Sequence, residues 1–105
     1  MARVPTLAVC AIMKNEAEAI EEWLAFHVLQ GASNLVLYDN LSSDDTVKRA
    51  RSFARRARIR VVPWPDSGSG FDTTQRLAYL DGIGRLIGAV DFVALIDLDE
   101  FLHGG

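Results

Sequence analysis

The sequence lacks most of the features that mark disulfide-rich, zinc-binding, nucleic-acid-binding or membrane-spanning proteins. Its single cysteine, Cys10, excludes a disulfide within the chain and any zinc-binding spacing, and it favours a cytoplasmic location. The formal net charge of −3 gives no reason to expect nucleic acid as a partner. The apolar run at residues 6–13 is too short to span a bilayer, and it continues into a polar segment without a signal-peptide cleavage site.

What is present is a regular alternation of apolar segments. The 105 residues are half hydrophobic, which fits one compact domain with a modest core. A continuous apolar run predicts a strand at residues 7–13, and further strands are predicted at residues 34–38, 58–62 and 91–96. Helical spacing of apolar residues predicts helices at residues 20–28, 44–57 and 73–88. Right-handed crossovers then give an α/β fold, a mostly parallel four-stranded sheet with helices on both faces.

The helical patterns also predict which side chains face the core. In the first helix these are Ile20, Trp23, Leu24, His27 and Val28, so His27 is a core histidine rather than a catalytic base. In the second they are Val47, Ala50, Phe53, Ala54 and Ala57. In the third they are Leu77, Leu80 and Ile87, with Gly82 and Gly84 weakening the helix.

Turn and cap signals lie between these elements. Gly31 is placed for a left-handed helix cap, and Ser42 with Asp45 resembles a capping box. Ser43 and Asp44 suit the same capping role better than ligand binding. The longest loop covers residues 63–72, and loops of that length are often functional.

Polar residues follow three of the predicted strands. Ligands of open parallel sheets bind outside the carboxyl ends of the strands, which all lie at one edge. Here those ends carry Lys14-Asn15-Glu16, Asp39-Asn40 and Asp97-Leu98-Asp99-Glu100. The sequence therefore predicts one polar site at this edge.

Asp97 and Asp99 are the most specific pair at that edge. Residues two apart on an extended backbone point the same way, so their two carboxylates share one place. Two negative charges this close repel each other unless a cation or bound protons neutralise them. Mn²⁺ and Mg²⁺ prefer such oxygen ligands. The alternative is that both carboxylates cap the next turn or are solvated.

Other candidates for a nucleotide-sugar site each have a structural alternative. Asp39 suits a base N–H or a ribose hydroxyl, or else a turn that it closes on its own backbone. Glu16 suits a ribose and Asn15 the orientation of the loop, but both also suit a helix start. Gln75 and Arg76 begin the third predicted helix beside the long loop, where Arg76 suits a phosphate or is simply a surface arginine.

Two further patterns do not predict function. The basic residues between Lys48 and Arg58 form a solvated helix face, so we do not expect a membrane surface as partner. The run Gly82 to Gly88 resembles a dinucleotide fingerprint, but it lies late in a helix instead of after the first strand.

Four ordered motifs resemble those of glycosyltransferases of the family 2-like group with the GT-A fold. They are Lys14-Asn15-Glu16, Glu22-Trp23-Leu24-Ala25-Phe26-His27, Tyr38-Asp39-Asn40-Leu41-Ser42-Ser43-Asp44-Asp45-Thr46 and Asp97-Leu98-Asp99-Glu100-Phe101. Asp45 stands where glycine is commoner, and Gln75 with Ala78 and Tyr79 also fits this branch. The resemblance implies a Rossmann-like GT-A half domain that binds a nucleoside-diphosphate sugar, usually a uridine one.

The same resemblance implies roles for individual residues. Asp39 would contact the base or ribose, Asp99 the metal, and Asp97 the ribose or donor sugar. Because a complete GT-A domain continues well past this Asp-x-Asp motif, we expect residues 1–105 to be a single nucleotide-sugar-binding domain, truncated relative to a full glycosyltransferase.

The predicted function is metal-dependent transfer of a sugar from a nucleoside diphosphate to an unknown acceptor. The alternative is a binding module without catalysis, since no candidate general base is evident. A phospho-receiver domain is disfavoured because the acidic pair expected after the first strand is missing. If the chain is half a domain, the far edge of its sheet is unpaired, and dimerisation or aggregation through that edge is a hazard.

Overall fold

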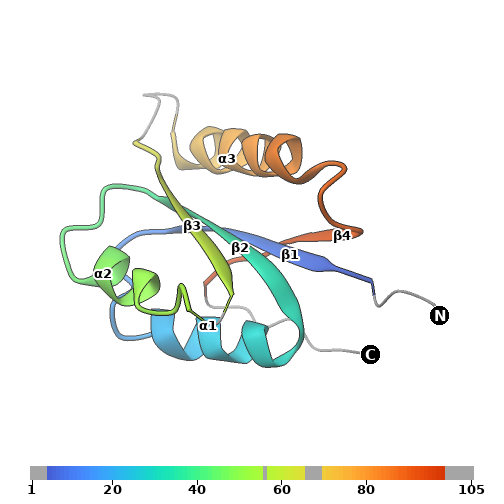
Figure 1. Ribbon diagram of the computed structural model, residues 1–105. Helices are drawn as coiled ribbons and strands as arrows, with labels where there is room; N and C mark the ends of the chain where they lie inside the picture. The colour runs from blue at the N-terminus through green and yellow to red at the C-terminus, as the bar shows by residue number, and fades with distance from the viewer. Residues whose placement is uncertain (1–4, 56, 66–69, 99–105) are drawn as a thin grey trace.

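The computed structural model describes residues 5–55, 57–65 and 70–98, in which four strands alternate with three helices (Figure 1). The strands are β1 (Leu7–Met13), β2 (Ala32–Asp39), β3 (Arg58–Pro63) and β4 (Phe92–Leu95). The helices are α1 (Ile20–Leu29), α2 (Thr46–Arg51) and α3 (Phe71–Leu86). None of these helices is long and apolar enough to cross a membrane.

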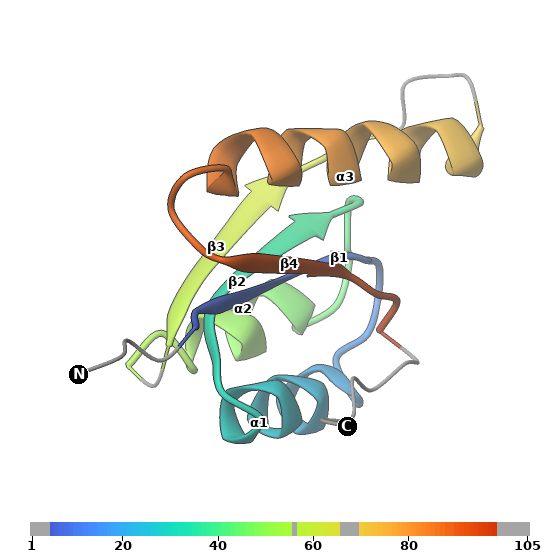
Figure 2. The same cartoon turned by 90° about the vertical axis from the view of Figure 1, so that its right-hand side faces the viewer.

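The sheet has the order β3-β2-β1-β4, and every neighbouring pair is parallel. Helices α1 and α2 cover one face of the sheet and α3 covers the other (Figures 1 and 2). The predicted α/β fold is therefore confirmed. A parallel sheet needs a long crossover after each strand, and each helix supplies one.

The buried residues form one core on each face of the sheet. Alternate residues of β1 contribute to both: Val9 and Ala11 pack with α1 and α2, whereas Ala8 and Cys10 lie beneath α3. All four are fully buried. This explains why β1 is an unbroken apolar run, because both of its faces are covered.

Helix α1 and its end follow the sequence pattern. Ile20, Trp23, Leu24 and His27 are buried as predicted. The Nδ1–H of His27 donates to the carbonyl of Trp23, four residues earlier, at 2.8 Å. Gly31, with a φ of 99°, ends the helix in the left-handed conformation that glycine adopts readily.

Helix α2 is shorter than the predicted 44–57, and the expected capping box is absent. The helix ends at Arg51, and Ala54 is exposed. The Ser42 hydroxyl accepts a bond from the Asn15 N–H instead, and Asp44 accepts the N–H of Thr46 at 3.0 Å. The capping-box prediction failed because the Ser42 hydroxyl bonds to Asn15, which is distant in the sequence.

Helix α3 faces the sheet with different residues from those predicted. Leu77, Leu80 and Ile87 are 44%, 59% and 77% exposed, so their inward assignment was wrong. The buried residues recur every four positions and are Thr74, Ala78, Gly82 and Leu86. Small residues let the helix lie close to the sheet: a Cβ on Gly82 would come within 2.8 Å of the Cys10 sulfur.

A tyrosine and an ion pair fix α3 against the sheet. The Tyr38 hydroxyl, on β2, donates to Asp81 Oδ2 at 2.7 Å, and Arg85 Nε donates to the same oxygen at 2.5 Å. Burial, and then the bond to Asp81, raise the pKa of Tyr38, so the phenol remains a donor. These bonds lie in the second half of α3 and hold its register on the sheet.

Candidate functional site

The carboxyl ends of the strands meet at one edge of the sheet, as predicted. Met13 pairs with Asp39, and Asp39 with Pro63. On the other side β4 pairs Leu95 with Cys10, and the Ile96 N–H donates to the Cys10 carbonyl at 3.1 Å. Continuing this register places Asp97 level with Ile12 near the end of β1.

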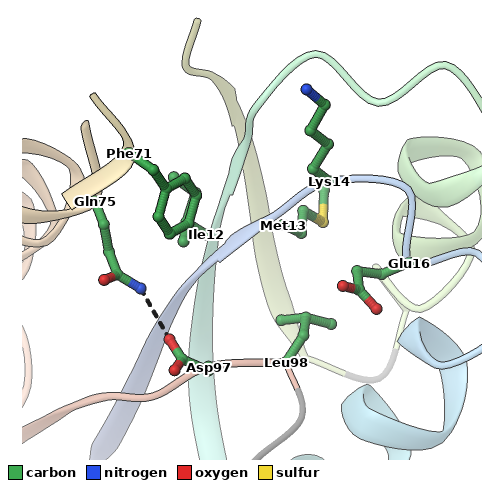
Figure 3. Close-up of a pocket in the computed structure, with 8 residues that line it drawn as sticks. All are labelled: Ile12, Met13, Lys14, Glu16, Phe71, Gln75, Asp97 and Leu98. Carbon is green, nitrogen blue, oxygen red and sulfur yellow. Dashed lines mark hydrogen bonds between the residues drawn. The ribbon is translucent and has the colours of Figure 1, made fainter. Parts of the chain in front are cut away.

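A cleft of about 350 Å³ opens at this edge, between the end of β1, the segment after β4 and the start of α3 (Figure 3). Its lining combines apolar, acidic, basic and amide side chains. They are Ile12, Met13, Lys14, Glu16, Phe71, Gln75, Asp97 and Leu98. The structure thus brings Glu16, Gln75 and Asp97 together from three separate segments of the predicted site.

Asp97 is held from both sides of the sheet. Its side chain is exposed, and its Oδ1 accepts the Gln75 amide at 2.9 Å and the Tyr79 hydroxyl at 3.3 Å (Figure 3 shows the first). From the opposite face, the indole N–H of the buried Trp23 donates to the Asp97 carbonyl at 3.2 Å. The motif tryptophan of α1 therefore anchors the backbone of the acidic motif.

The backbone of Glu16 has the helix-start role considered for it. Its carbonyl accepts the N–H groups of Ala19 and Ile20 at 3.0 and 2.8 Å, so its backbone starts α1. Its own N–H donates to the Thr46 hydroxyl at 2.8 Å. Its carboxylate lines the cleft (Figure 3), and contact with a ribose stays a prediction.

Asn15 joins two loops of the site edge. Its φ of 53° turns the chain sharply after β1. Its amide oxygen accepts the Ser43 N–H at 2.7 Å and the Ser43 hydroxyl at 3.3 Å. The structure accordingly gives Asn15 the orienting role, and direct contact with a nucleotide sugar stays a prediction.

Asp39 lies at the same edge but outside the lining of the cleft. It is half-buried, and its carboxylate accepts the Ser42 N–H at 3.3 and 3.4 Å, which is the turn role considered for it. The neighbouring Asn40 is buried and donates from Nδ2 to the Trp64 carbonyl at 2.8 Å. Asn40 thereby ties the end of β3 to the end of β2, and contact of Asp39 with a base or ribose stays a prediction.

Arg76 lies outside the lining of the cleft, and Asp99 lies outside the described residues. Arg76 is exposed and lines a second groove, between α3 and β4, with Leu80, Ile83 and Leu95 among its neighbours. The metal contact predicted for Asp99 is untested. Within residues 5–98 as described, no group of three or more histidine, cysteine, aspartate or glutamate side chains is placed to hold a metal ion.

Phe71 and Tyr79 were absent from the predicted site, whereas Lys14 belongs to the predicted polar edge. Lys14 is on the rim, extending away from Asp97, and the Phe71 ring is 52% exposed (Figure 3). Phe71, Gln75 and Tyr79 are four residues apart, so they share one face of α3. Their spacing was available in the sequence, but apolar periodicity alone did not distinguish this face from the buried one beside it.

Two titratable groups lie away from the cleft. Burial, and then the charge of Asp81, raise the pKa of the Cys10 thiol to about 11, so the thiolate is scarce at neutral pH. Burial lowers the pKa of His27, and the bond to the Trp23 carbonyl opposes this effect. Neither side chain lines the cleft, so both belong to the core.

Comparison with known proteins gives a consistent match over the chain. The sequence profile of glycosyltransferase family 92 matches residues 6–103. The family 92 protein Os08g0121900 of Oryza sativa subsp. japonica is 28% identical over 102 residues, and RCOM_0530710 of Ricinus communis is 26% identical over 98. They cover 93% and 92% of this chain, which spans only 16% and 17% of their length.

Solved structures show the same fold. The crystal structure of S. aureus TarS 1–349 superposes with a TM-score of 0.66 at 17% identity, over 91% of this chain and 28% of that one. Its complex with UDP gives a TM-score of 0.68 at 18% identity, with the same coverage. At this low identity the match shows a shared fold, and it assigns no TarS residue role to this chain.

Proposed function

Because the chain belongs to glycosyltransferase family 92, we propose that it forms the nucleotide-sugar-binding part of a metal-dependent glycosyltransferase. The motifs suggested the family 2-like group, whereas the family that matches is 92. The observation that carries the proposal is the placement of Asp97 in a cleft at the carboxyl edge of a parallel sheet. That edge is where open α/β sheets bind their ligands.

The proposed donor is a nucleoside-diphosphate sugar, most simply a uridine one. The structure of similar fold, TarS, was solved with UDP. In this chain the exposed ring of Phe71 offers an apolar face for a base, and Lys14 on the rim offers a positive charge for a phosphate. Glu16 and Asp39 are the carboxylates proposed for the ribose or base, with Asn15 fixing their loops.

The proposed cofactor is Mn²⁺ or Mg²⁺, held by Asp97 together with Asp99. The fit rests on Asp97, whose carboxylate faces the cleft and is the type of oxygen ligand that both ions prefer. A bound ion would supply positive charge against a departing diphosphate. Asp97 would hold that ion, while Phe71 and Glu16 would hold the nucleoside beside it.

The alternative is a module that binds the donor without transferring it. The chain spans 16% and 17% of the length of the Oryza sativa and Ricinus communis relatives, so transfer by a whole protein of this family is a separate proposal from donor binding by this chain. Incubating the protein with Mn²⁺ and a UDP-sugar separates the two functions. Release or transfer of the sugar would contradict pure binding.

The first test is calorimetric titration of UDP into the protein with Mn²⁺, and then with a chelator. We expect binding that requires Mn²⁺ and that Asp97→Ala and Asp99→Ala each abolish, because each removes a proposed ligand. Glu21→Ala, on the exposed face of α1, is the matched control and should bind like the unchanged protein. Equal UDP binding in Mn²⁺ and in chelator would show that the proposed metal role is wrong.

We also propose that two copies associate through β4. This strand is an edge of the described sheet, and its Phe92 and Leu95 are 62% and 38% exposed. At the opposite edge β3 carries Arg58, Arg60 and Pro63, which discourage pairing. An apolar edge without such protection suits a second strand of the same kind.

A further inference from the structure

One face of α3 reaches the acidic motif, and its Tyr79 also packs against the core beneath the helix. Gln75 and Tyr79 lie one helical turn apart on this face, and both reach the Oδ1 of Asp97. We infer that Gln75 and Tyr79 are positioning residues, which hold the Asp97 carboxylate in the orientation that a divalent cation requires. This inference rests on the proposed function, because it concerns the same cation.

The backbone of Asp97 is fixed independently of its side chain. Trp23 is fully buried beneath the other face of the sheet, and its indole N–H holds the Asp97 carbonyl. What remains free in an aspartate with a fixed backbone is rotation about its side-chain torsions. Gln75 and Tyr79 restrict that rotation, so the three bonds together fix the carboxylate in place.

The hydrogen count supports a small network. The Gln75 amide has two hydrogens, and its nitrogen lies 2.9 Å from Asp97 Oδ1 and 3.3 Å from the Tyr79 oxygen. The Tyr79 hydroxyl has one hydrogen, with Asp97 Oδ1 at 3.3 Å and the Ile96 carbonyl at 3.4 Å as acceptors. Gln75 can therefore donate to both partners while Tyr79 donates onward.

Gln75 and Tyr79 are neutral donors, and this matters for a cation site. An arginine or lysine in their place would orient the carboxylate but also offset its charge. An amide and a phenol orient it and leave its negative charge for the metal. Such partners of metal ligands typically change metal affinity about 10–100-fold when they are removed.

The rigidity of α3 comes from elsewhere on the helix. Tyr38, Asp81 and Arg85 hold its second half, where Gly82 contacts the sheet. The chain therefore offers a matched pair of tyrosines. The Tyr38 hydroxyl, on the sheet, donates a hydrogen bond to Asp81 of the helix. The Tyr79 hydroxyl, on the helix, donates one to Asp97 of the acidic motif.

The test compares Tyr79→Phe, Gln75→Leu and Tyr38→Phe in the full chain. UDP binding is measured by calorimetry over a series of Mn²⁺ concentrations, and Tm is measured for each variant. We expect Tyr79→Phe and Gln75→Leu to raise the Mn²⁺ concentration for half-maximal UDP binding about tenfold. At saturating Mn²⁺ their UDP affinity should approach that of the unchanged protein.

Tyr38→Phe should lower Tm and leave the Mn²⁺ dependence unchanged. Unchanged Mn²⁺ dependence in both Tyr79→Phe and Gln75→Leu would overturn the positioning role while leaving the proposed function intact. An equal shift in Tyr38→Phe would also overturn it, because the effect would then follow the docking of α3. Absence of Mn²⁺-dependent UDP binding in the unchanged protein would overturn the proposed function and this inference together.

Discussion

His27 is the buried titratable residue whose charge change falls nearest to neutral pH. Burial lowers its pKa in the folded protein, while in the unfolded chain the value is about 6.5. Below that pH the unfolded chain takes up a proton that the folded protein resists. The stability that neutral His27 contributes is therefore complete above about pH 6.5 and is lost as the pH falls below it.

His27→Gln tests this at the scale of one residue. Glutamine keeps a side-chain N–H for the Trp23 carbonyl but does not titrate. We expect the free energy of unfolding of the unchanged protein to fall more between pH 7.5 and 5.5 than that of the variant, as measured by urea unfolding. Parallel pH dependence in the two proteins would show that His27 is not the responsible group.

Single residues of the site were predictable from the sequence where the backbone decides their place. Glu16 and Asp97 follow strands, and parallel strands bring their carboxyl ends together without help from side chains. Phe71 and Tyr79 were missed because their place depends on which face α3 turns to the sheet. The face that α3 turns to the sheet is determined by the close approach of Gly82 to Cys10, and apolar periodicity does not reveal such a contact.

At the scale of elements, α3 shows why the larger apolar residues were assigned wrongly. The pattern assumes that a helix buries its largest hydrophobic side chains. Here the sheet beneath carries Tyr38 and Cys10, which already fill the space, so only small residues fit opposite them. Leu77 and Leu80 are left on the outer side.

Gly82 and Gly84 offer a matched test of that packing. A methyl group at Gly82 would approach the Cys10 sulfur to 2.8 Å and the Tyr38 oxygen to 3.2 Å, whereas at Gly84 it would contact nothing within 4 Å. We expect Gly82→Ala to destabilise the protein by ~1–3 kcal/mol through overpacking. Gly84→Ala should stabilise it by ~0.5–1 kcal/mol, because alanine favours the helix.

Urea unfolding of the two glycine variants gives both values. Stabilisation by Gly82→Ala would mean that α3 does not lie as close to β1 and β2 as described. The comparison is informative because both glycines are in the same helix, so the gain in helix propensity is shared and only the packing differs.

At the scale of the whole molecule, the two edges of the described sheet differ in polarity: β3 carries arginines, whereas β4 carries exposed apolar side chains. The proposed association through β4 predicts a sedimentation coefficient that rises with protein concentration. Phe92→Lys should abolish that rise, because a charge at an edge strand opposes pairing. Leu29→Lys is the matched control: Leu29 is 85% exposed at the end of α1 and is not part of β4.

A rise that persists in Phe92→Lys would place the contact elsewhere on the molecule. A concentration-independent sedimentation coefficient in the unchanged protein would show that β4 does not pair with a second copy.

The overall fold was more predictable than its details. The order of strands and helices follows from apolar runs and helical spacing, and right-handed crossovers then leave few arrangements of the sheet. The short length of α2 was not predictable, because Ser42 and Asp44 bond to a loop about 27 residues earlier in the sequence. Such bonds depend on the completed fold.

The bonds between the loop after β1 and the loop after β2 have a consequence for how this domain changes in evolution. Asn15 contacts Ser43, and the Glu16 N–H contacts Thr46, so the conformation of each loop depends on the other. Inserting or deleting one residue in either loop would break both contacts at once. Among sequences of common descent, the lengths of these two loops should therefore stay constant together, and substitutions at positions 15 and 43 should covary.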